Sequence, residues 1–202
     1  RVLGHEIRNS LTPVSSLAES LASKSDSTRE KQALEVISER CHHLQDFVNR
    51  YSSLSQTLNL NIQQLDVASF EGRIKGLFSK NNLSFVTQSQ WFWADTIFIE
   101  QVFINLIKNA FEAEATQVQI KFTEKSQQSI IKIIDNGPGI APEMMEKIFY
   151  PMISGRPSGT GLGLSIAQQI INFHNGVIEC DSSPGATVFS VYLPLEGLNG
   201  QS

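Results

Sequence analysis

The chain has 202 residues, 41% of them hydrophobic and 18% charged, and a net charge of −4. This is ordinary globular composition with room for one or two domains. Without a basic excess, nucleic acid and anionic membrane surfaces are disfavoured as partners. No apolar run reaches the roughly 18 residues of a membrane span, so we expect no membrane contact by this chain. The widely separated Cys41 and Cys180 indicate reduced thiols in a cytoplasmic protein rather than a metal site.

Residues 1–58 are predicted to form an antiparallel pair of helices. Apolar residues recur every three or four positions over residues 1–22, and the turn-rich "SKSDS" (23–27) separates this helix from a second one over about 28–58. The second helix has a nearly strict heptad seam made of Leu34, Ile37, Cys41, Leu44, Val48, Tyr51 and Leu58. A hairpin roughly 45 Å long does not bury its seams alone. We therefore predict a homodimer whose hairpins form a four-helix bundle. The alternative is that the seam packs on the second domain.

A linker over residues 59–65 is predicted to run into a strand, and the mixed pattern of residues 66–195 predicts a second domain. Its expected elements are a helix from Ala68 to about Lys80, strands near Leu83–Thr87 and Trp91–Trp93, a helix from Thr96 to about Glu114 capped by Asp95, strands at Val118–Thr123 and Ser129–Ile134, a short helix near Pro142–Phe149, a helix from about Leu162 to His174, and strands at Val177–Asp181 and Thr187–Leu193. This order predicts an α+β protein in which a helical hairpin is followed by a two-layer α/β sandwich. Residues 196–202 are expected to be a disordered tail.

Three segments of the second domain carry groups suited to a nucleotide. "DNGPGI" (135–140) ends a strand with a carboxylate and adds two glycines that permit close backbone approach. "GTGLGLS" (159–165) opens a helix, whose free N–H groups favour phosphate. "NLIKNAFEA" (105–113) places Asn105 and Asn109 on one helix face, and amide oxygens suit Mg²⁺. Each segment alone is also compatible with a tight loop or a polar helix surface.

The opening stretch "HEIRNSLTP" (5–13) places His5 and Asn9 on one face of the first helix. The chain begins inside this pattern, and we expect it to be part of a longer protein. His5 alone would be read as a solvated helix residue; a nucleotide site in the same chain favours a nucleophile. His42 and His43 are expected to be solvated, and His174 to end a helix where a partly charged imidazole is favourable.

These segments together resemble the catalytic core of two-component sensor histidine kinases over residues 1–195. "HEIRNSLTP" is similar to the phospho-acceptor histidine box, "NLIKNAFEA" to the asparagine box, "DNGPGI" and "GTGLGLS" to the two glycine boxes, and "KIFYPMIS" to the phenylalanine box. The five occur in the family's order, and the histidine box and short lid look most like the nitrogen-regulation subgroup. Ser10 departs from the proline usual in the family, and Tyr150 and Met152 depart from its acidic and aromatic residues.

The resemblance implies an ATP-binding domain of the GHKL (Bergerat) type, shared with gyrase, Hsp90 and MutL. It implies that His5 is the catalytic phospho-acceptor, that Glu6 accepts a hydrogen bond from its ring, and that Asn9 orients water during dephosphorylation. Asp135 would accept from the adenine amino group, Thr187 would support adenine through water, and Asn109 would ligate Mg²⁺. The other residues implied in ATP binding are Asn105, Lys108, Gly137, Gly139, Phe149, Arg156, Gly159, Thr160, Gly161, Leu162 and Gly163.

The implied function is that of an ATP-dependent autokinase that phosphorylates His5 and passes the phosphoryl group to an aspartate of a response-regulator receiver domain. The family is also compatible with a parent protein anchored in the inner membrane. Two alternatives stay open, namely a protein that is mainly a phosphatase of its regulator and a dimeric nucleotide-binding scaffold without kinase activity. A clamp-type ATPase of the same fold is disfavoured because "NLIKN" lacks a glutamate in the turn before Asn109.

Overall fold

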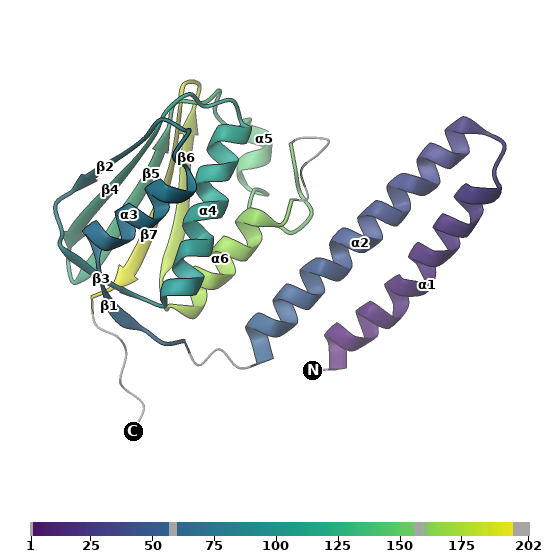
Figure 1. The fold of residues 1–202 in the computed structure, drawn as a ribbon, viewed down its shortest axis with the longest axis horizontal. Coiled ribbons are helices and arrows are strands. Elements are labelled where there is room, and N and C mark those ends of the chain that lie inside the picture. Colours follow the sequence, from purple (N-terminus) through teal and green to yellow (C-terminus); the bar gives the residue numbers. More distant parts are fainter. Residues whose placement is uncertain (1, 57–59, 156–158, 160, 196–202) are drawn as a thin grey trace. The chain divides into compact units, whose positions relative to one another are not determined.

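The computed structural model of the chain describes residues 2–56, 60–155, 159 and 161–195; within the helices, the side chains of residues 2–8, 43 and 46–56 are outside the description. The chain divides into two compact units, Arg1–Leu58 and Asn59–Ser202. The predicted order of helices and strands is confirmed along the described part of the chain (Figure 1). The expected tail, residues 196–202, lies outside the described residues.

The first unit is an antiparallel hairpin of α1 (Val2–Lys24) and α2 (Thr28–Gln56). The turn between them is closed by the Ser27 hydroxyl, which accepts a hydrogen bond from the Glu30 N–H at 3.3 Å. Small residues fill the interface between the helices, and the buried ones are Ser15, Ala18, Ala22, Ser38 and Cys41.

The heptad seam predicted on α2 is only partly covered within one hairpin. Cys41 is buried and Leu34 is half-buried, but Ile37 is 46% exposed. The large apolar side chains that stay exposed on the hairpin are Val14, Leu17, Leu21, Val36 and Ile37. The hairpin thus uses small residues for its own interface and leaves an apolar surface without a partner inside the described unit.

The second unit is built on a five-stranded mixed sheet with the strand order β2-β4-β5-β7-β6. Its strands are β2 (Leu83–Thr87), β4 (Val118–Lys125), β5 (Gln128–Asp135), β6 (Val177–Ser183) and β7 (Ala186–Pro194). β2 and β4 are parallel, and every other pair is antiparallel. A two-stranded antiparallel sheet is added by β1 (Gln63–Asp66) and β3 (Trp91–Ala94). β1 occupies the end of the predicted linker, so residues 63–65 belong to a strand.

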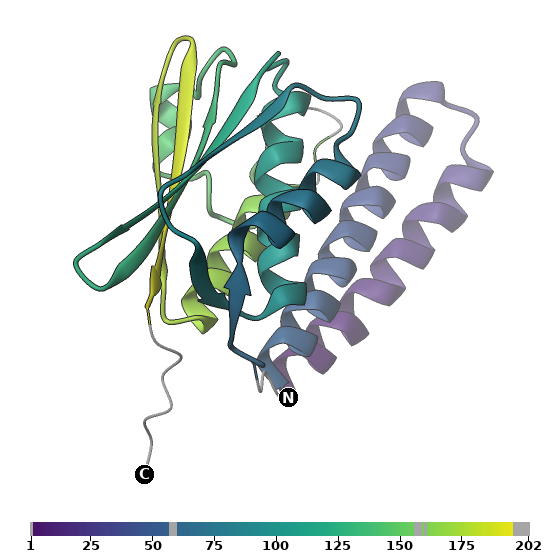
Figure 2. The ribbon, with the colours of Figure 1, turned by 60° about the vertical axis from the view of Figure 1, so that its left-hand side comes forward.

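Helices cover one face of the large sheet, as Figure 2 shows. They are α3 (Val67–Leu77), α4 (Thr96–Glu112) and α6 (Gly163–Phe173), while α5 (Pro142–Met145) is a single turn, shorter than predicted. Alternating side chains of β4 and β5 point to this face and are buried. The core between the layers contains a group of phenylalanines, and the ring of Phe70 lies edge-on to those of Phe92 and Phe103 with centroids 5.2 and 4.8 Å apart. None of the helices in the described part of the chain combines the length and hydrophobicity needed to cross a membrane.

Candidate functional site

Asp135 stands at the end of β5, at the helix-covered face of the sheet, where it is only 6% exposed. Its Oδ1 accepts a hydrogen bond from the Gly137 N–H at 2.8 Å. Burial raises the pKa of this carboxyl above its ordinary value, and the bond from Gly137 opposes that effect. A carboxylate held in such a place is costly for the free protein, which is typical of a group reserved for a ligand.

Hydroxyl groups continue from Asp135 across the sheet. Thr187 is the direct neighbour of Asp135 in the β5–β7 register and is 5% exposed. On the far side of Thr187, the Oγ of Ser182 lies 3.1 Å from the Thr187 Oγ1. The same Ser182 oxygen accepts a hydrogen bond from the Ile140 N–H at 2.9 Å. Ser182 was not among the residues expected in the site, although it connects Thr187 to the glycine-rich loop.

Gly139 brings the loop after β5 against the β6–β7 turn. Its φ is +86°, and a Cβ at this position would lie 2.6 Å from the Ser183 carbonyl oxygen. Both the backbone conformation and the lack of space therefore require glycine. This contact explains why the loop needs a glycine at position 139, one of the two glycines of "DNGPGI" that indicate a nucleotide site in the sequence.

Asn136 fastens the start of the same loop, a role that the sequence analysis missed. Its Oδ1 accepts hydrogen bonds from the N–H groups of Thr116 and Gln117, both at 2.9 Å. Its Nδ2 donates to the Thr116 Oγ1 at 2.9 Å. The side chain thus joins the loop after β5 to the segment before β4.

The two asparagines of α4 meet the beginning of α6. Asn105 donates from Nδ2 to the Gly163 carbonyl oxygen at 3.2 Å. A Cβ on Gly163 would lie 3.8 Å from both the Asn105 Cγ and the Asn109 Nδ2, so both amides lie beside the position of this glycine. Leu162, the buried N-cap of α6, supplies no side-chain cap. No side chain of the described residues caps the start of α6, which lies beside two amide side chains, and such a helix start is suited to an anion.

Lys108 lies on the exposed side of the same helix. Its Nζ is 3.9 Å from the Glu112 Oε1. This exposed pair contributes little to stability, which leaves the ammonium group free to change partner when a more strongly charged ligand is present.

The segment before α6 is closed at its base. The Met152 N–H donates to the Gly161 carbonyl oxygen at 2.9 Å, and both residues have positive φ, +64° and +67°. Just before this closure, Phe149 lies edge-on to Phe189 of β7, with ring centroids 6.4 Å apart. The phenylalanine is thus attached to the sheet at the point where the loop begins.

Some predicted residues cannot be placed in this way. Arg156 and Thr160 lie outside the described residues, while Gly159 is described and half-buried. The backbone of His5 and Glu6 is in α1, but their side chains are outside the description. Asn9 is exposed on the same helix. Among the predicted residues, the structure therefore shows two local groups: Asp135 with Gly137 and Thr187, and Asn105 and Asn109 with Gly163.

Asp95 caps the start of α4, as predicted, and it also has a second role that the sequence analysis did not predict. Its Oδ1 accepts from the N–H groups of Ile97 and Phe98, and its Oδ2 accepts from the Asn61 N–H. Its own N–H donates to the Nε2 of His174 at 3.0 Å. Asp95 therefore connects Asn61, near the start of this unit, to the beginning of α4 and to the end of α6.

His174 corrects the expectation of a partly charged imidazole at a helix end. The side chain is 5% exposed, and because Nε2 accepts from Asp95, Nδ1 carries the proton and donates to the Ile170 carbonyl oxygen at 2.7 Å. Burial lowers the pKa of His174 below 6.5, while the bond to Ile170 and the charge of Asp95 oppose this. Its neutral form is part of the folded structure.

We expect His174 to make the second unit less stable in acid. Because the folded-state pKa is below the unfolded value of 6.5, its contribution is complete above about pH 6.5 and is lost as the pH falls through the folded pKa. The test is urea unfolding of wild type and His174→Gln over this range, followed by the fluorescence of Trp91 and Trp93, both on β3. The stability advantage of wild type should shrink below about pH 6.5; an advantage independent of pH would contradict the assignment.

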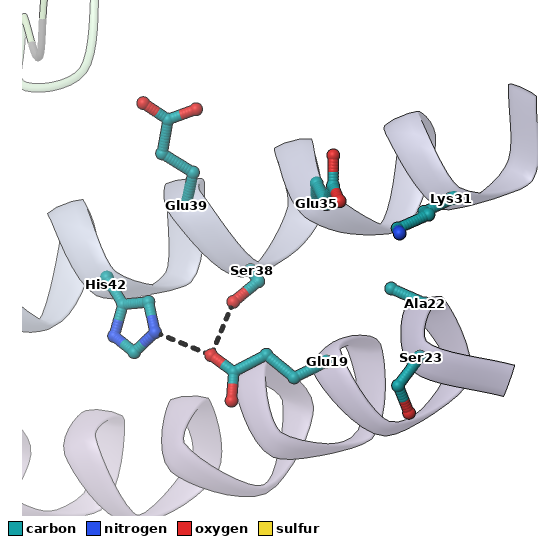
Figure 3. A pocket seen from close by; sticks show the side chains of 8 residues that line it. All are labelled: Glu19, Ala22, Ser23, Lys31, Glu35, Ser38, Glu39 and His42. Atoms are coloured by element: carbon teal, nitrogen blue, oxygen red, sulfur yellow. Dashed lines mark hydrogen bonds and ion pairs between the residues drawn. The ribbon is translucent and has the colours of Figure 1, made fainter. Parts of the chain in front are cut away.

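A groove lined mostly by polar and charged residue types lies between the two helices of the hairpin (Figure 3). The Glu19 Oε1 accepts from the Ser38 hydroxyl at 2.9 Å and lies 2.9 Å from the His42 Nε2. The hydrogen bonds from His42 and then Ser38 lower the pKa of Glu19. His42 was expected to be solvated. Its side chain is indeed exposed, but it also contacts Glu19 of the neighbouring helix. Glu19 is fourteen residues from His5, ~21 Å along α1, so this cluster is separate from the histidine box.

Cys180 of β6 lies on the same side of the sheet as Thr187. Burial raises the pKa of its thiol to about 12, and the charges of Asp135 and Asp181 act in the same direction. The thiol is therefore protonated at neutral pH and is not an activated nucleophile. Within the described residues, no group of three histidine, cysteine, aspartate or glutamate side chains is arranged to hold a metal.

Comparisons with known proteins match the second unit to one family. Residues 94–197 match the family described as histidine kinase-, DNA gyrase B-, and HSP90-like ATPase. The chain is 44% identical over 111 residues to the sensory histidine kinase/phosphatase NtrB of Vibrio alginolyticus, and 44% identical over 110 residues to NtrB of Escherichia coli O157:H7. Each alignment covers 48% of this chain and 32% of the relative, so the chain spans about a third of the length of these curated relatives.

Solved structures with a similar fold extend the comparison to the hairpin. The Acinetobacter baumannii histidine kinase AdeS has a TM-score of 0.65 and 25% identity, covering 95% of this chain and 98% of that one. The histidine kinase ThkA, solved in complex with the response regulator protein TrrA, has a TM-score of 0.64 and 25% identity, covering 97% of this chain and 60% of that one.

Proposed function

Because the chain belongs to the family of histidine kinase-, DNA gyrase B- and HSP90-like ATPases, we propose that it is an ATP-dependent protein histidine kinase. In this proposal the second unit binds ATP and the hairpin carries the phospho-acceptor, His5. The observation that supports it best is the buried Asp135 beside Thr187, in the same unit as Asn105, Asn109 and the start of α6. The second unit therefore holds both a hydrogen-bond acceptor for a nucleobase and hydrogen-bond donors for phosphates.

Adenine is proposed to bind at the sheet end of the region. The amino group of the base donates to Asp135, and the Thr187 hydroxyl supports the neighbouring ring nitrogen directly or through water. Gly137 and Gly139 let the backbone lie close to the base. The phosphates are proposed to extend toward the start of α6. Phe149 is proposed to attach the lid, the segment between it and α6, to the sheet, while Lys108 and Arg156 supply positive charge. The lid and its base are proposed to contribute Gly159, Thr160, Gly161, Leu162 and Gly163.

The amide groups also suit Mg²⁺. This ion commonly takes one or two protein oxygens and completes its coordination with phosphate oxygens and water. The Asn109 amide reaches the same glycine as Asn105, and the described residues hold no cluster of acidic side chains that would bind the ion without a nucleotide. We propose that Asn109 holds Mg²⁺, which would neutralise charge on the phosphates.

His5 is proposed to accept the γ-phosphoryl group. A neutral imidazole, whose ordinary pKa is ~6.5, has a free ring nitrogen at neutral pH. This nitrogen forms a bond to the γ-phosphorus as the bond from phosphorus to the β,γ-bridging oxygen breaks, and ADP leaves with the electron pair. Glu6 accepts a hydrogen bond from the other ring nitrogen and stabilises the positive charge that develops on the ring. An aspartate of a response-regulator receiver domain then takes the phosphoryl group from the histidine.

The working form is proposed to be a homodimer. Val14, Leu17, Leu21, Val36 and Ile37 leave large apolar surfaces on one hairpin, and two hairpins together would bury them as a four-helix bundle. The complex between ThkA and a response regulator supports a receiver domain as the second partner.

Phosphatase activity toward the same regulator is the second candidate. The relatives NtrB carry both activities in their name, and Asn9 is an exposed amide four residues after His5. We propose that Asn9 orients the water that hydrolyses the regulator's phosphoaspartate. Kinase and phosphatase would thus share one helix face.

The test is incubation of the chain with γ-labelled ATP and Mg²⁺. We expect label that is stable in alkali and lost in acid, the behaviour of a phosphorus–nitrogen bond. His5→Ala should reduce it to background because the attacking nitrogen is removed. His42→Ala is the matched control, since His42 is on the same hairpin but contacts Glu19, and it should keep the label. Label retained by His5→Ala, or absent from wild type that binds ATP, would contradict the kinase proposal.

A further inference from the structure

Ser182 occupies the position where the glycine-rich loop, β6 and β7 meet. Its Oγ accepts a hydrogen bond from the Ile140 N–H at 2.9 Å. Across the β6–β7 register it faces Thr187, and the two hydroxyl oxygens are 3.1 Å apart. On the other side of Thr187, the β5–β7 register places Asp135. A continuous row of polar groups thus runs from the loop backbone to the buried carboxylate.

The Ser182 hydroxyl is at the centre of the hydrogen bonds in this row. The Ile140 N–H can only donate, so the Ser182 oxygen is an acceptor there and its single proton must be donated elsewhere. Two acceptors are in reach, the Thr187 Oγ1 at 3.1 Å and the Ala186 carbonyl oxygen at 3.5 Å. The shorter contact is the stronger hydrogen bond. Either hydroxyl can donate across the 3.1 Å contact; when Ser182 donates to Thr187, the proton of the Thr187 hydroxyl remains to be donated away from Ser182.

We propose that Ser182 is a positioning residue that sets the nucleobase specificity of the site, because it keeps Thr187 a hydrogen-bond donor next to Asp135, an acceptor. This inference rests on the proposed ATP function and deepens it. Adenine presents an amino donor and, beside it, a ring-nitrogen acceptor, which complement a carboxylate and a hydroxyl donor. Guanine presents a carbonyl acceptor and an N–H donor at the same places, the reverse arrangement. A buried site that leaves such groups unpaired rejects the wrong ligand strongly.

Removing the Ser182 hydroxyl would release Thr187. Its proton could then point to the site or away from it, and the Thr187 oxygen could accept as well as donate. The site would lose part of its preference for adenine while its shape stayed the same. The Ile140 N–H would also lose its partner, so a test must separate this effect on the loop from the effect on Thr187.

The experiment measures the Kd of ATP and of GTP in the presence of Mg²⁺ by titration calorimetry. Ser182→Ala is compared with Ser182→Thr, which keeps a hydroxyl, and with Ser183→Ala, a neighbour that is exposed. We expect Ser182→Ala to lower the preference for ATP over GTP about 3- to 10-fold, the equivalent of one hydrogen bond. Ser182→Thr should restore the preference, and Ser183→Ala should match wild type.

A double-mutant cycle separates the two roles of Ser182. Thr187→Val removes the hydroxyl through which Ser182 acts, so adding Ser182→Ala to it should cause no further loss of preference. Equal weakening of ATP and GTP by Ser182→Ala, or an additive loss in the double variant, would overturn the inference in favour of a purely structural role. Wild type that binds ATP with a preference unaffected by Ser182→Ala would overturn this inference alone. Wild type that binds no ATP would overturn the proposed function and this inference with it.

Discussion

Asp135→Asn is expected to weaken ATP binding about 10- to 100-fold, the loss of a hydrogen bond to a charged group. The amide oxygen introduced by this substitution can still accept from the Gly137 N–H, as the Asp135 carboxylate does at 2.8 Å. The other end of the amide is then an NH₂ group, which would face the amino group of adenine. Two hydrogen-bond donors would then face each other, where the proposed ATP complex pairs the adenine amino group with the Asp135 carboxylate.

The same substitution should not destabilise the free chain. Burial raises the pKa of Asp135, so the ionised carboxylate costs free energy at neutral pH, and a neutral amide removes that cost. Binding and stability should therefore change in opposite directions, which a general disruption of the fold would not produce.

The measurements are titration calorimetry with ATP and urea unfolding of the free chain at neutral pH. Asp181→Asn is the matched control because Asp181 is exposed on β6, and it should change neither quantity appreciably. ATP affinity unchanged in Asp135→Asn would remove this carboxylate from the nucleotide site. A large loss of stability in the same variant would instead make it a structural residue.

Local signals in the sequence predicted most of the elements. Asp95 was predicted to cap the helix after it, and its carboxylate does accept from Ile97 and Phe98. The pattern of residues 118–134 also predicted the strands β4 and β5. In these cases the deciding interactions are between residues close in the sequence or follow from a simple period. The four-residue strand β1 was harder to delimit, because its partner β3 begins 25 residues after β1 ends.

Long-range partners explain the residues that sequence reasoning missed or misjudged. His174 at the end of a helix suggests partial charge, but its neutral state depends on Asp95, 79 residues earlier in the chain. Ser182 is one of several serines in polar stretches, and only the register of β6 on β7 places it against Thr187. His42 and Glu19 meet because the two helices of the hairpin are antiparallel. None of these pairings leaves a pattern in a single sequence.

The site was predicted largely by resemblance, and the structure supplies the physical reasons for part of it. Gly163, the third glycine of "GTGLGLS", lies beside Asn105 and Asn109. The loop glycine Gly139 is required by its contact with Ser183. Composition and periodicity alone could not distinguish these glycines from those of an ordinary turn, because the constraint comes from a segment distant in the sequence.

Gly139→Ala is expected to destabilise the second unit by about 3–5 kcal/mol, in the range of severe backbone and packing defects. Its φ of +86° is unfavourable for alanine, and the new Cβ would lie 2.6 Å from the Ser183 carbonyl oxygen and 2.9 Å from its carbon. Both are backbone atoms, so no side-chain rotation relieves the contact. The loop must move away from the β6–β7 turn, which would also separate Ile140 from Ser182.

Gly185 provides a matched control for this effect. Its φ is +87°, nearly that of Gly139, but nothing lies within 4 Å of its Cβ position. Gly185→Ala therefore incurs the conformational cost alone, roughly 1–2 kcal/mol. Urea unfolding followed by Trp91 and Trp93 fluorescence reports on the unit that contains both glycines. The excess loss in Gly139→Ala over Gly185→Ala measures the contact between the loop and β6. If the two variants lose equal stability, the loop is not held against Ser183, and the row of hydrogen bonds from Ile140 to Thr187 would lose its basis as well.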